Sequence, residues 1–128
     1  MDFDWKDYIK LAEKLYIESN KDSIEEAYNR SVISRSYYGI FCISRIKAGL
    51  ESYKPSKETD PGTHKKVISY YKSSNKLDEK ELGKILDELR KWRNDADYEG
   101  RKGIDKNAAE RAILKANEAL KLLGENLN

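Results

Sequence analysis

The chain has 128 residues and a formal net charge of +2 at pH 7, and 38% of its residues are charged. This length allows one hydrophobic core of useful size but not two, so we expect a single domain over residues 1–128. Acidic and basic residues are interleaved, without the basic excess that is typical of proteins that bind nucleic acid through charge alone. This balance of acidic and basic residues does not exclude a small basic patch that contacts a phosphate.

Several classes of site are excluded by what the sequence lacks. It has no GxxxxGK[ST], GxGxxG or HExxH motif, and it has a single histidine and a single cysteine, Cys42. These two residues cannot form a dedicated His/Cys zinc site, and a lone cysteine excludes an internal disulfide. We therefore expect neither a metal nor a cofactor. The start does not resemble a secretory leader and no apolar run is long enough to span a bilayer, so we expect a cytoplasmic protein with no membrane partner.

The first two predicted elements are helices. Residues 4–19 place apolar side chains at the three- and four-residue spacing of an amphipathic helix. A capping box formed by Ser23 and Glu26 predicts the start of a second helix that is longer than usual for a globular protein. Over residues 32–46 this helix is apolar on most sides, which is typical of the central helix of a bundle. Gly39 costs about 1 kcal/mol relative to Ala in a helix, so we expect it to allow close approach of another helix.

Three further helices follow. Residues 51–62 contain both prolines and are mostly polar, which predicts a loop. Thr63 can cap a short third helix, with His64 in its first turn. A capping box that begins at Asp78 predicts the fourth helix, and Asp105 predicts the start of the fifth, whose alanines suit close packing against the second. The sequence therefore predicts an all-α, up-and-down bundle of about five helices.

Charged side chains inside apolar stripes are the most informative feature. Residues 82–98 form an apolar stripe at helical spacing that includes Arg93, and Asp97 follows it by four residues on the same helix face. A guanidinium in such a seam needs a partner, because removing one member of a buried ion pair costs roughly 3–5 kcal/mol. Arg35 interrupts the apolar pattern of the second helix, and it needs an acidic or polar partner for the same reason.

Two interpretations of these arginines are open at this point. They form a structural network, or they belong to a site in which two guanidiniums with tyrosine and asparagine donors hold a phosphate group. The polar residues concerned lie on the second and fourth predicted helices and are Arg35, Tyr38, Arg93, Asn94, Asp97 and Tyr98.

Three segments of the chain carry a family resemblance. They read RSVISRSYYGIFCISRIKAGL at residues 30–50, THKKVI at residues 63–68 and LRKWRNDADY at residues 89–98. In this order and spacing they resemble the HEPN domain (higher eukaryotes and prokaryotes nucleotide-binding), in particular its small stand-alone prokaryotic members. The resemblance implies an all-α up-and-down bundle that forms a homodimer. It also implies a minimal nucleotidyltransferase as an antitoxin partner, because such proteins are often encoded beside one in toxin–antitoxin or defence pairs.

The resemblance also bears on catalysis. Many HEPN domains are metal-independent endoribonucleases with an Arg, a polar residue after it and a His four to six residues beyond the Arg, and two copies of this motif meet at the dimer interface. In this sequence Arg93 and Asn94 match the first two positions, whereas Asp97, Tyr98 and Glu99 stand where the histidine would be. An enzyme would therefore need another group for proton transfer.

Three functional hypotheses follow. In the first, the chain is a HEPN-type module that binds RNA, a nucleotide or a protein partner through a polar centre of Arg35, Tyr38, Arg93 and Asp97. In the second, it is a metal-independent endoribonuclease: Arg93 and Asn94 hold the phosphate, and Tyr98 or His64 transfers a proton. In the third, it is a purely structural helical interaction protein whose arginines only satisfy nearby acidic and tyrosine side chains.

Overall fold

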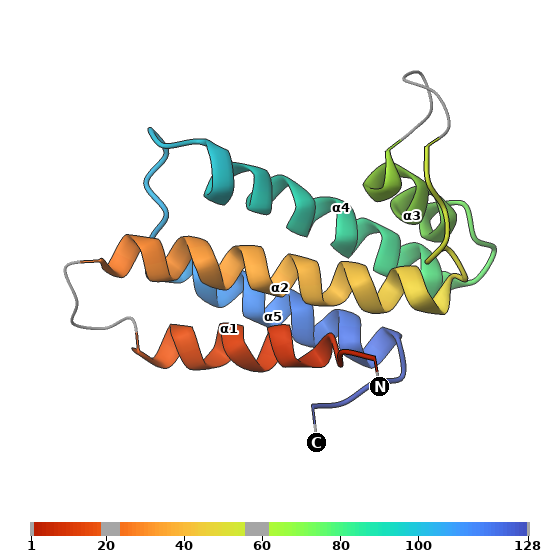
Figure 1. Cartoon of the computed structure of the whole chain (residues 1–128), viewed down its shortest axis with the longest axis horizontal. Helices are drawn as coiled ribbons and strands as arrows, with labels where there is room; N and C mark the ends of the chain where they lie inside the picture. The colour runs from red at the N-terminus through yellow and green to blue at the C-terminus, as the bar shows by residue number, and fades with distance from the viewer. Residues whose placement is uncertain (1, 19–23, 56–61, 128) are drawn as a thin grey trace.

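The computed structural model describes residues 2–18, 24–55 and 62–127, and within these ranges all regular structure is helical. The helices in chain order are α1 (Lys6–Glu18), α2 (Glu25–Lys47), α3 (Thr63–Lys72), α4 (Leu77–Tyr98) and α5 (Lys106–Leu122). Figure 1 shows that α1 and α4 run opposite to α2, while α5 runs in the same direction as α2. The predicted all-α, up-and-down bundle is therefore confirmed.

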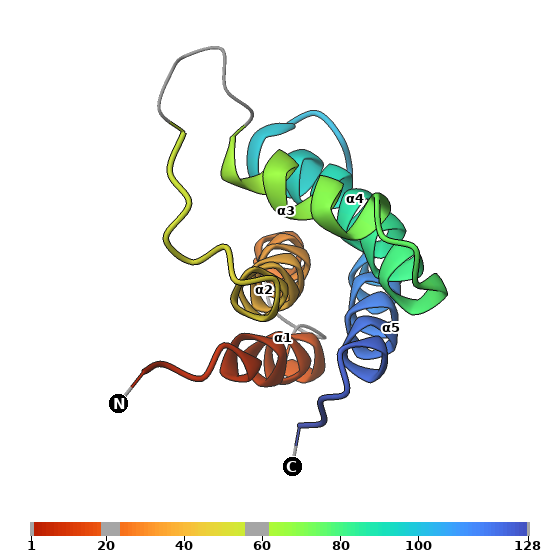
Figure 2. The same cartoon turned by 90° about the vertical axis from the view of Figure 1, so that its right-hand side faces the viewer.

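Helix α2 lies at the centre of the bundle. It packs against each of the other four helices, and the end-on view in Figure 2 shows α1, α5, α4 and α3 arranged around it. The predicted close approach at Gly39 is also present. A Cβ atom at Gly39 would lie 2.5 Å from Ile9 Cδ1 and 3.3 Å from the carbonyl oxygen of Trp5, so the absence of a side chain allows α1 to pack this closely.

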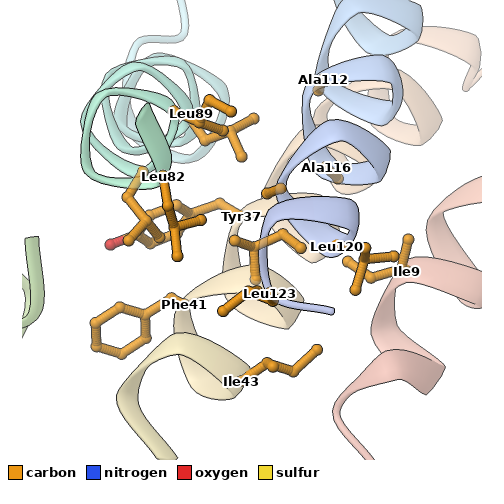
Figure 3. Close-up of a cluster of buried hydrophobic side chains, with 14 of the residues drawn as sticks. Ile9, Tyr37, Phe41, Ile43, Leu82, Leu89, Ala112, Ala116, Leu120 and Leu123 are labelled. Carbon is orange, nitrogen blue, oxygen red and sulfur yellow. The ribbon is translucent and has the colours of Figure 1, made fainter. Parts of the chain in front are cut away.

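All five helices contribute to the main cluster of the core, and Figure 3 shows part of it. A smaller buried cluster consists of Ala12, Val32 and Ala109. The alanines of α5 that face α2, such as Ala112 and Ala116, are completely buried, as the sequence predicted. Tyr37 is also fully buried and reaches from α2 toward α4, with its hydroxyl on the side away from α5. One side of α2 therefore packs against small apolar side chains, and another carries a buried hydroxyl toward α3 and α4.

The predicted helix starts were correct in some places and wrong in others. Asp105 caps α5, and its Oδ1 accepts a hydrogen bond of 2.9 Å from the backbone N–H of Ala108. Helix α4 begins at Leu77 with Lys76 as its cap residue, so the capping box predicted at Asp78 is wrong. The reason is that Ser74 Oγ already accepts a hydrogen bond from the backbone N–H of Lys76 and turns the chain into the helix.

The starts of α2 and α3 also differ from the predicted caps. The cap residue of α2 is Ile24, without a side-chain hydrogen bond, and the predicted cap Ser23 lies outside the described residues. Helix α3 begins at Thr63 as predicted, but the cap position is taken by Gly62 and Thr63 is the first helical residue. This places His64 in the first turn of α3, which packs against both α2 and α4.

Candidate anion-binding site between helices α2, α3 and α4

Arg93 is buried between α4 and α2, and aromatic rings surround it. Its side chain is only 7% exposed. The guanidinium carbon lies 5.3 Å from the ring centroid of Tyr37, 5.2 Å from that of Tyr38 and 5.8 Å from that of Tyr98. Each ring presents its electron-rich face to the cation, which offsets part of the cost of removing the charge from water. Aromatic faces, more than a carboxylate, therefore hold this cation in the seam.

The predicted contact between Arg93 and Asp97 is present but loose. Arg93 Nη1 lies 3.9 Å from Asp97 Oδ2, which is too long for a hydrogen bond, and Asp97 Oδ2 also accepts a hydrogen bond of 3.4 Å from Ser34 Oγ. The Nε–H of Arg93 is buried and has no hydrogen-bond partner, and the same is true of the Nε–H of Arg90 one turn earlier on α4. Two neighbouring guanidiniums therefore have donor capacity that the described part of the chain does not use.

His64 joins this region from α3. Its Nδ1 lies 2.5 Å from the hydroxyl oxygen of Tyr37, and its ring stacks on Phe41 with a centroid distance of 4.3 Å and an interplanar angle of 17°. Burial, together with the positive charges of Arg90 and Arg93, lowers the pKa of His64 from 6.5 to about 4. The imidazole is therefore neutral at pH 7, and the two neighbouring cations favour this neutral form.

Tyr37 links His64 to Arg93. It is hydrogen-bonded to the imidazole, and its ring faces the guanidinium. Burial raises the pKa of Tyr37 well above its ordinary value of 10, so its hydroxyl stays protonated. In the tautomer with the His64 proton on Nδ1, the free lone pair is on Nε2, where a neutral imidazole can accept a proton from a bound ligand.

An arginine of α2, Arg30, holds in place the end of α4 on which this region lies. Its Nη1 donates to the carbonyl oxygens of Asp95 at 3.2 Å and Ala96 at 2.9 Å. Its Nη2 donates to the carbonyl oxygens of Glu99 at 3.1 Å and Lys102 at 2.6 Å. These groups include the carbonyls that the last turn of a helix leaves without partners. Arg30 therefore anchors the segment on which Arg93, Asp97 and Tyr98 lie.

The structure brings together only part of the predicted polar set. Tyr38, Asp97 and Tyr98 lie around Arg93, and His64 is connected to it through Tyr37. Asn94 follows Arg93 on α4 and is exposed. Arg35 points elsewhere: its guanidinium lies over the ring of Tyr8 on α1, with 4.9 Å between the guanidinium carbon and the ring centroid. The partner of Arg35 is thus an aromatic face of α1.

Sequence reasoning missed three residues of this region: Tyr37, Arg90 and Arg30. Arg90 could have been found, because it lies three residues before Arg93 and so shares its helix face. Tyr37 lies within the stretch over residues 32–46 that is predicted to be apolar on most sides, and it does belong to the core. Nothing in the sequence pattern indicates the carbonyl partners of Arg30, since these acceptors lie 65 to 72 residues later in the chain.

Two further observations bear on the kind of site. Within the described ranges, no three His, Cys, Asp or Glu side chains are grouped so that they could hold a metal ion. Among the same residues, none of the helices is both long enough and apolar enough to cross a membrane.

Comparison with known proteins identifies the family. A sequence model of the HEPN domain matches residues 5–127, which is nearly the whole chain. The chain therefore belongs to the HEPN domain family, as the resemblance of its three segments predicted. No curated protein and no solved structure gives a significant match.

Proposed function

We propose that this HEPN domain binds RNA and that Arg90 and Arg93 hold a phosphate group of the bound strand. The observation that carries the proposal is that both Nε–H groups are buried and have no hydrogen-bond partner. A buried donor without a partner costs about 1–3 kcal/mol, and a phosphate oxygen would remove that cost. A guanidinium also matches phosphate geometry, because its planar donors can bind two oxygens at once.

The surroundings of the two guanidiniums support an anionic ligand. The nearest carboxylate, that of Asp97, lies 3.9 Å from Arg93 and does not satisfy it. Helix α3 begins beside this region with no acidic residue in its first turn, so its positive end adds to the local potential. His64 is neutral there, so the charge of this region comes from the two guanidiniums and not from the imidazole.

Titration of fluorescein-labelled RNA, followed by anisotropy at two or more salt concentrations, tests the proposal. Arg93→Met keeps an apolar stem in the seam and removes the charge, and we expect about a 10-fold or larger loss of affinity. The slope of log affinity against log salt should decrease by about 0.7 for each lost phosphate contact. Arg90→Met should act in the same direction.

Arg111→Met is the matched control. Its guanidinium carbon also lies over an aromatic ring, 5.8 Å from that of Trp92, but outside this region. RNA affinity that is equal in all three variants and the unsubstituted chain would reject the proposal. Circular dichroism melts of each variant separate lost binding from lost folding.

The position of His64 favours a second candidate function, metal-independent cleavage of RNA. His64 Nε2 would take the proton of a ribose 2′-hydroxyl as its oxygen attacks the adjacent phosphorus, and the bond from phosphorus to the 5′-oxygen would break. Arg93 and Asn94 would stabilise the charge that develops on the phosphate. Tyr98, whose ring lies over Arg93, would return a proton to the leaving 5′-oxygen.

Incubation of RNA with the protein in EDTA decides between binding and cleavage. Cleavage requires products that end in a 2′,3′-cyclic phosphate and a 5′-hydroxyl. We expect His64→Gln to abolish cleavage and to leave RNA affinity within about twofold, because glutamine keeps a hydrogen-bonding side chain but cannot accept the proton. Intact RNA after incubation, at protein concentrations that saturate binding, would remove the enzyme and leave the binding module.

Family membership supports two proposals about protein partners. We propose that the chain forms a homodimer and that it acts in a toxin–antitoxin or defence pair with a minimal nucleotidyltransferase. Light scattering after size-exclusion chromatography measures the mass of the chain in solution, and a monomer at micromolar concentration would reject the dimer. Co-purification with the product of the neighbouring gene tests the pair.

A further inference from the structure

The outer side of the pair formed by α1 and α5 is hollowed. Helix α1 packs only against α2 and α5, and Figure 2 shows that no other described helix lies over the outer side of α1 and α5. Between these two helices lies a hollow of about 220 Å³ that is lined by Glu13, Tyr16 and Ile17 of α1 and by Glu110, Ile113 and Leu114 of α5. We call these six residues the α1–α5 groove. None of them belongs to the candidate anion-binding site.

The apolar side chains of the α1–α5 groove are largely in contact with solvent. Ile17 is 71% exposed and Leu114 is 60% exposed. Ile113 is half-buried and packs against the smaller core cluster, so it joins the groove to the interior. Large apolar side chains that are exposed together at one hollow are typical of a binding surface, because covering them removes apolar surface from water.

The charged side chains of the groove are both carboxylates. Glu13 accepts a hydrogen bond of 3.5 Å from the side-chain amide of Asn117, and Glu110 accepts one of 3.2 Å from the hydroxyl of Tyr16. Within the part of the chain that the structure describes, neither carboxylate forms an ion pair. The groove is therefore acidic as well as apolar, and its negative charge is not neutralised.

The lysines of the two helices lie outside the hollow. Lys115 forms ion pairs of 3.7 Å with two carboxylates that are not part of the groove. Lys106 donates to the carbonyl oxygen of Tyr16 at 3.2 Å, which holds its ammonium at the end of α1. Lys14 and Lys121 are exposed. Among the described residues, no lysine or arginine lines the hollow.

We propose that the α1–α5 groove is a docking site for a basic amphipathic helix of another protein. The apolar stripe of that helix would cover Ile17, Ile113 and Leu114, and lysines or arginines beside the stripe would pair with Glu13 and Glu110. Because α1 and α5 run in opposite directions side by side, they leave a groove between them that a third helix can fill. This inference does not depend on the proposed binding of RNA.

The charge of the groove argues against other occupants. A two-fold contact between copies of the chain would bring Glu13 and Glu110 of one copy toward the same carboxylates of the other, and the lining residues include no cation to pair with them. A nucleic acid or an anionic membrane surface would be repelled. A basic amphipathic helix is complementary in charge and also covers the apolar side chains.

Two synthetic helices of opposite charge test the inference. The probe is a fluorescein-labelled peptide of about 18 residues with Leu at positions three and four apart and Lys elsewhere, and the comparison peptide has Glu in place of every Lys. The chain has a net charge of +2, so a general attraction would favour the Glu peptide. We expect the Lys peptide to bind at least about 10-fold more tightly in anisotropy titrations. This preference should decrease at high salt, because salt screens the charges.

Substitutions in the groove have matched controls elsewhere on the surface. Leu114→Ser removes an apolar contact and should weaken binding of the Lys peptide about 5-fold or more. Leu77→Ser is its control, because Leu77 is 82% exposed at the start of α4. The double variant Glu13→Gln with Glu110→Gln should weaken binding about 5-fold and reduce its salt dependence. Glu118→Gln removes a carboxylate of α5 that pairs with a lysine outside the groove, and it should have no effect.

The remaining outcomes decide against the docking site. Equal binding of the two peptides, or equal affinity for the Lys peptide in Leu114→Ser and Leu77→Ser, would overturn it. Self-association of the unsubstituted chain that Leu114→Ser abolishes would overturn it in favour of a second copy. The Lys peptide should bind equally well to Arg93→Met, and RNA affinity should be unchanged in Leu114→Ser, so the docking site and the proposed function stand or fall separately.

Discussion

Two arginines lie in the seam between α2 and α4, and their surroundings differ. The Arg30 guanidinium donates to four backbone carbonyl oxygens and also forms an ion pair with Glu26, with 2.9 Å between Nη2 and Oε2. Arg93 is more deeply buried, yet it has a carboxylate no closer than 3.9 Å and a buried Nε–H with no partner. All three guanidinium nitrogens of Arg30 donate hydrogen bonds within the fold, whereas the buried Nε–H of Arg93 has no partner among the described residues.

This difference distinguishes a structural arginine from a site arginine. A purely structural role for both residues would predict that both are fully hydrogen-bonded, because leaving a buried donor without a partner has a cost. Only Arg30 meets that expectation. The unpartnered Nε–H of Arg93 is the reason that we propose it as a site residue, and substitutions at each of the two arginines test this proposal.

The largest expected effect is on stability, at Arg30. Arg30→Met should lower the free energy of unfolding by about 2–3 kcal/mol, because it removes charged hydrogen bonds to four carbonyls at the end of α4. Urea denaturation at pH 7 measures this. Arg30→Lys keeps the charge but has fewer and differently placed donors, so it should recover only part of the loss. A melt of Arg30→Met equal to that of the unsubstituted chain would contradict the anchoring role.

Arg93→Met should have a smaller effect on stability, of about 1 kcal/mol, although Arg93 is the more buried of the two. The substitution loses the cation–π contacts with three rings but also removes an unsatisfied donor. The same urea experiment checks it. A loss of several kcal/mol, together with unchanged RNA affinity, would favour the purely structural hypothesis, in which Arg93 only completes the fold.

The pH dependence of stability should reveal the lowered pKa of His64. The pKa of His64 is about 4 in the folded chain and near 6.5 when unfolded, so the unfolded state takes up its proton first as the pH falls. Above pH 6.5 the imidazole is neutral in both states, and the folded state has its full stability. As the pH falls from 6.5 to 4, protonation of His64 in the unfolded state lowers the free energy of unfolding. Between pH 7 and pH 5 we expect a loss of about 1 kcal/mol, after allowing for solvent screening of a partly exposed group.

His64→Gln is the control for this dependence. It should flatten the change in unfolding free energy between pH 7 and pH 5, whereas carboxylates of ordinary pKa act mainly below that range. An unchanged slope in His64→Gln would mean that the imidazole titrates normally in the folded state.

The smallest expected effect is at Asp97. Because its carboxylate lies 3.9 Å from Arg93, Asp97→Asn should change stability by less than about 0.5 kcal/mol. It should also raise RNA affinity about 2- to 5-fold, since a negative charge near the bound phosphate is removed. Asp95→Asn is the matched control, because Asp95 lies on the same helix but pairs with Lys102 at 3.0 Å. A fall in RNA affinity in Asp97→Asn would indicate that Asp97 orients Arg93 for binding.

The sequence by itself determined the features that depend on neighbours along the chain. The five helices follow from the three- and four-residue spacing of apolar side chains, and the central position of α2 follows from its apolar character on most sides. The cap at Asp105 and the meeting of Arg93 with Asp97 were predictable for the same reason, because a helix places residues three and four apart together.

Only the tertiary structure decided which partners those side chains have across the bundle. Arg35 interrupts the apolar pattern of α2 much as Arg93 interrupts that of α4, yet Arg35 faces Tyr8 of α1 whereas Arg93 faces Tyr38 of α2. The spacing along one helix does not say which neighbouring helix each face will meet. His64 lies 27 residues from Tyr37 in the chain, and its contact with that hydroxyl depends on how α3 packs against α2. Helical spacing specifies a face, but the angle and register between packed helices specify what that face meets, and these depend on side chains from several segments at once.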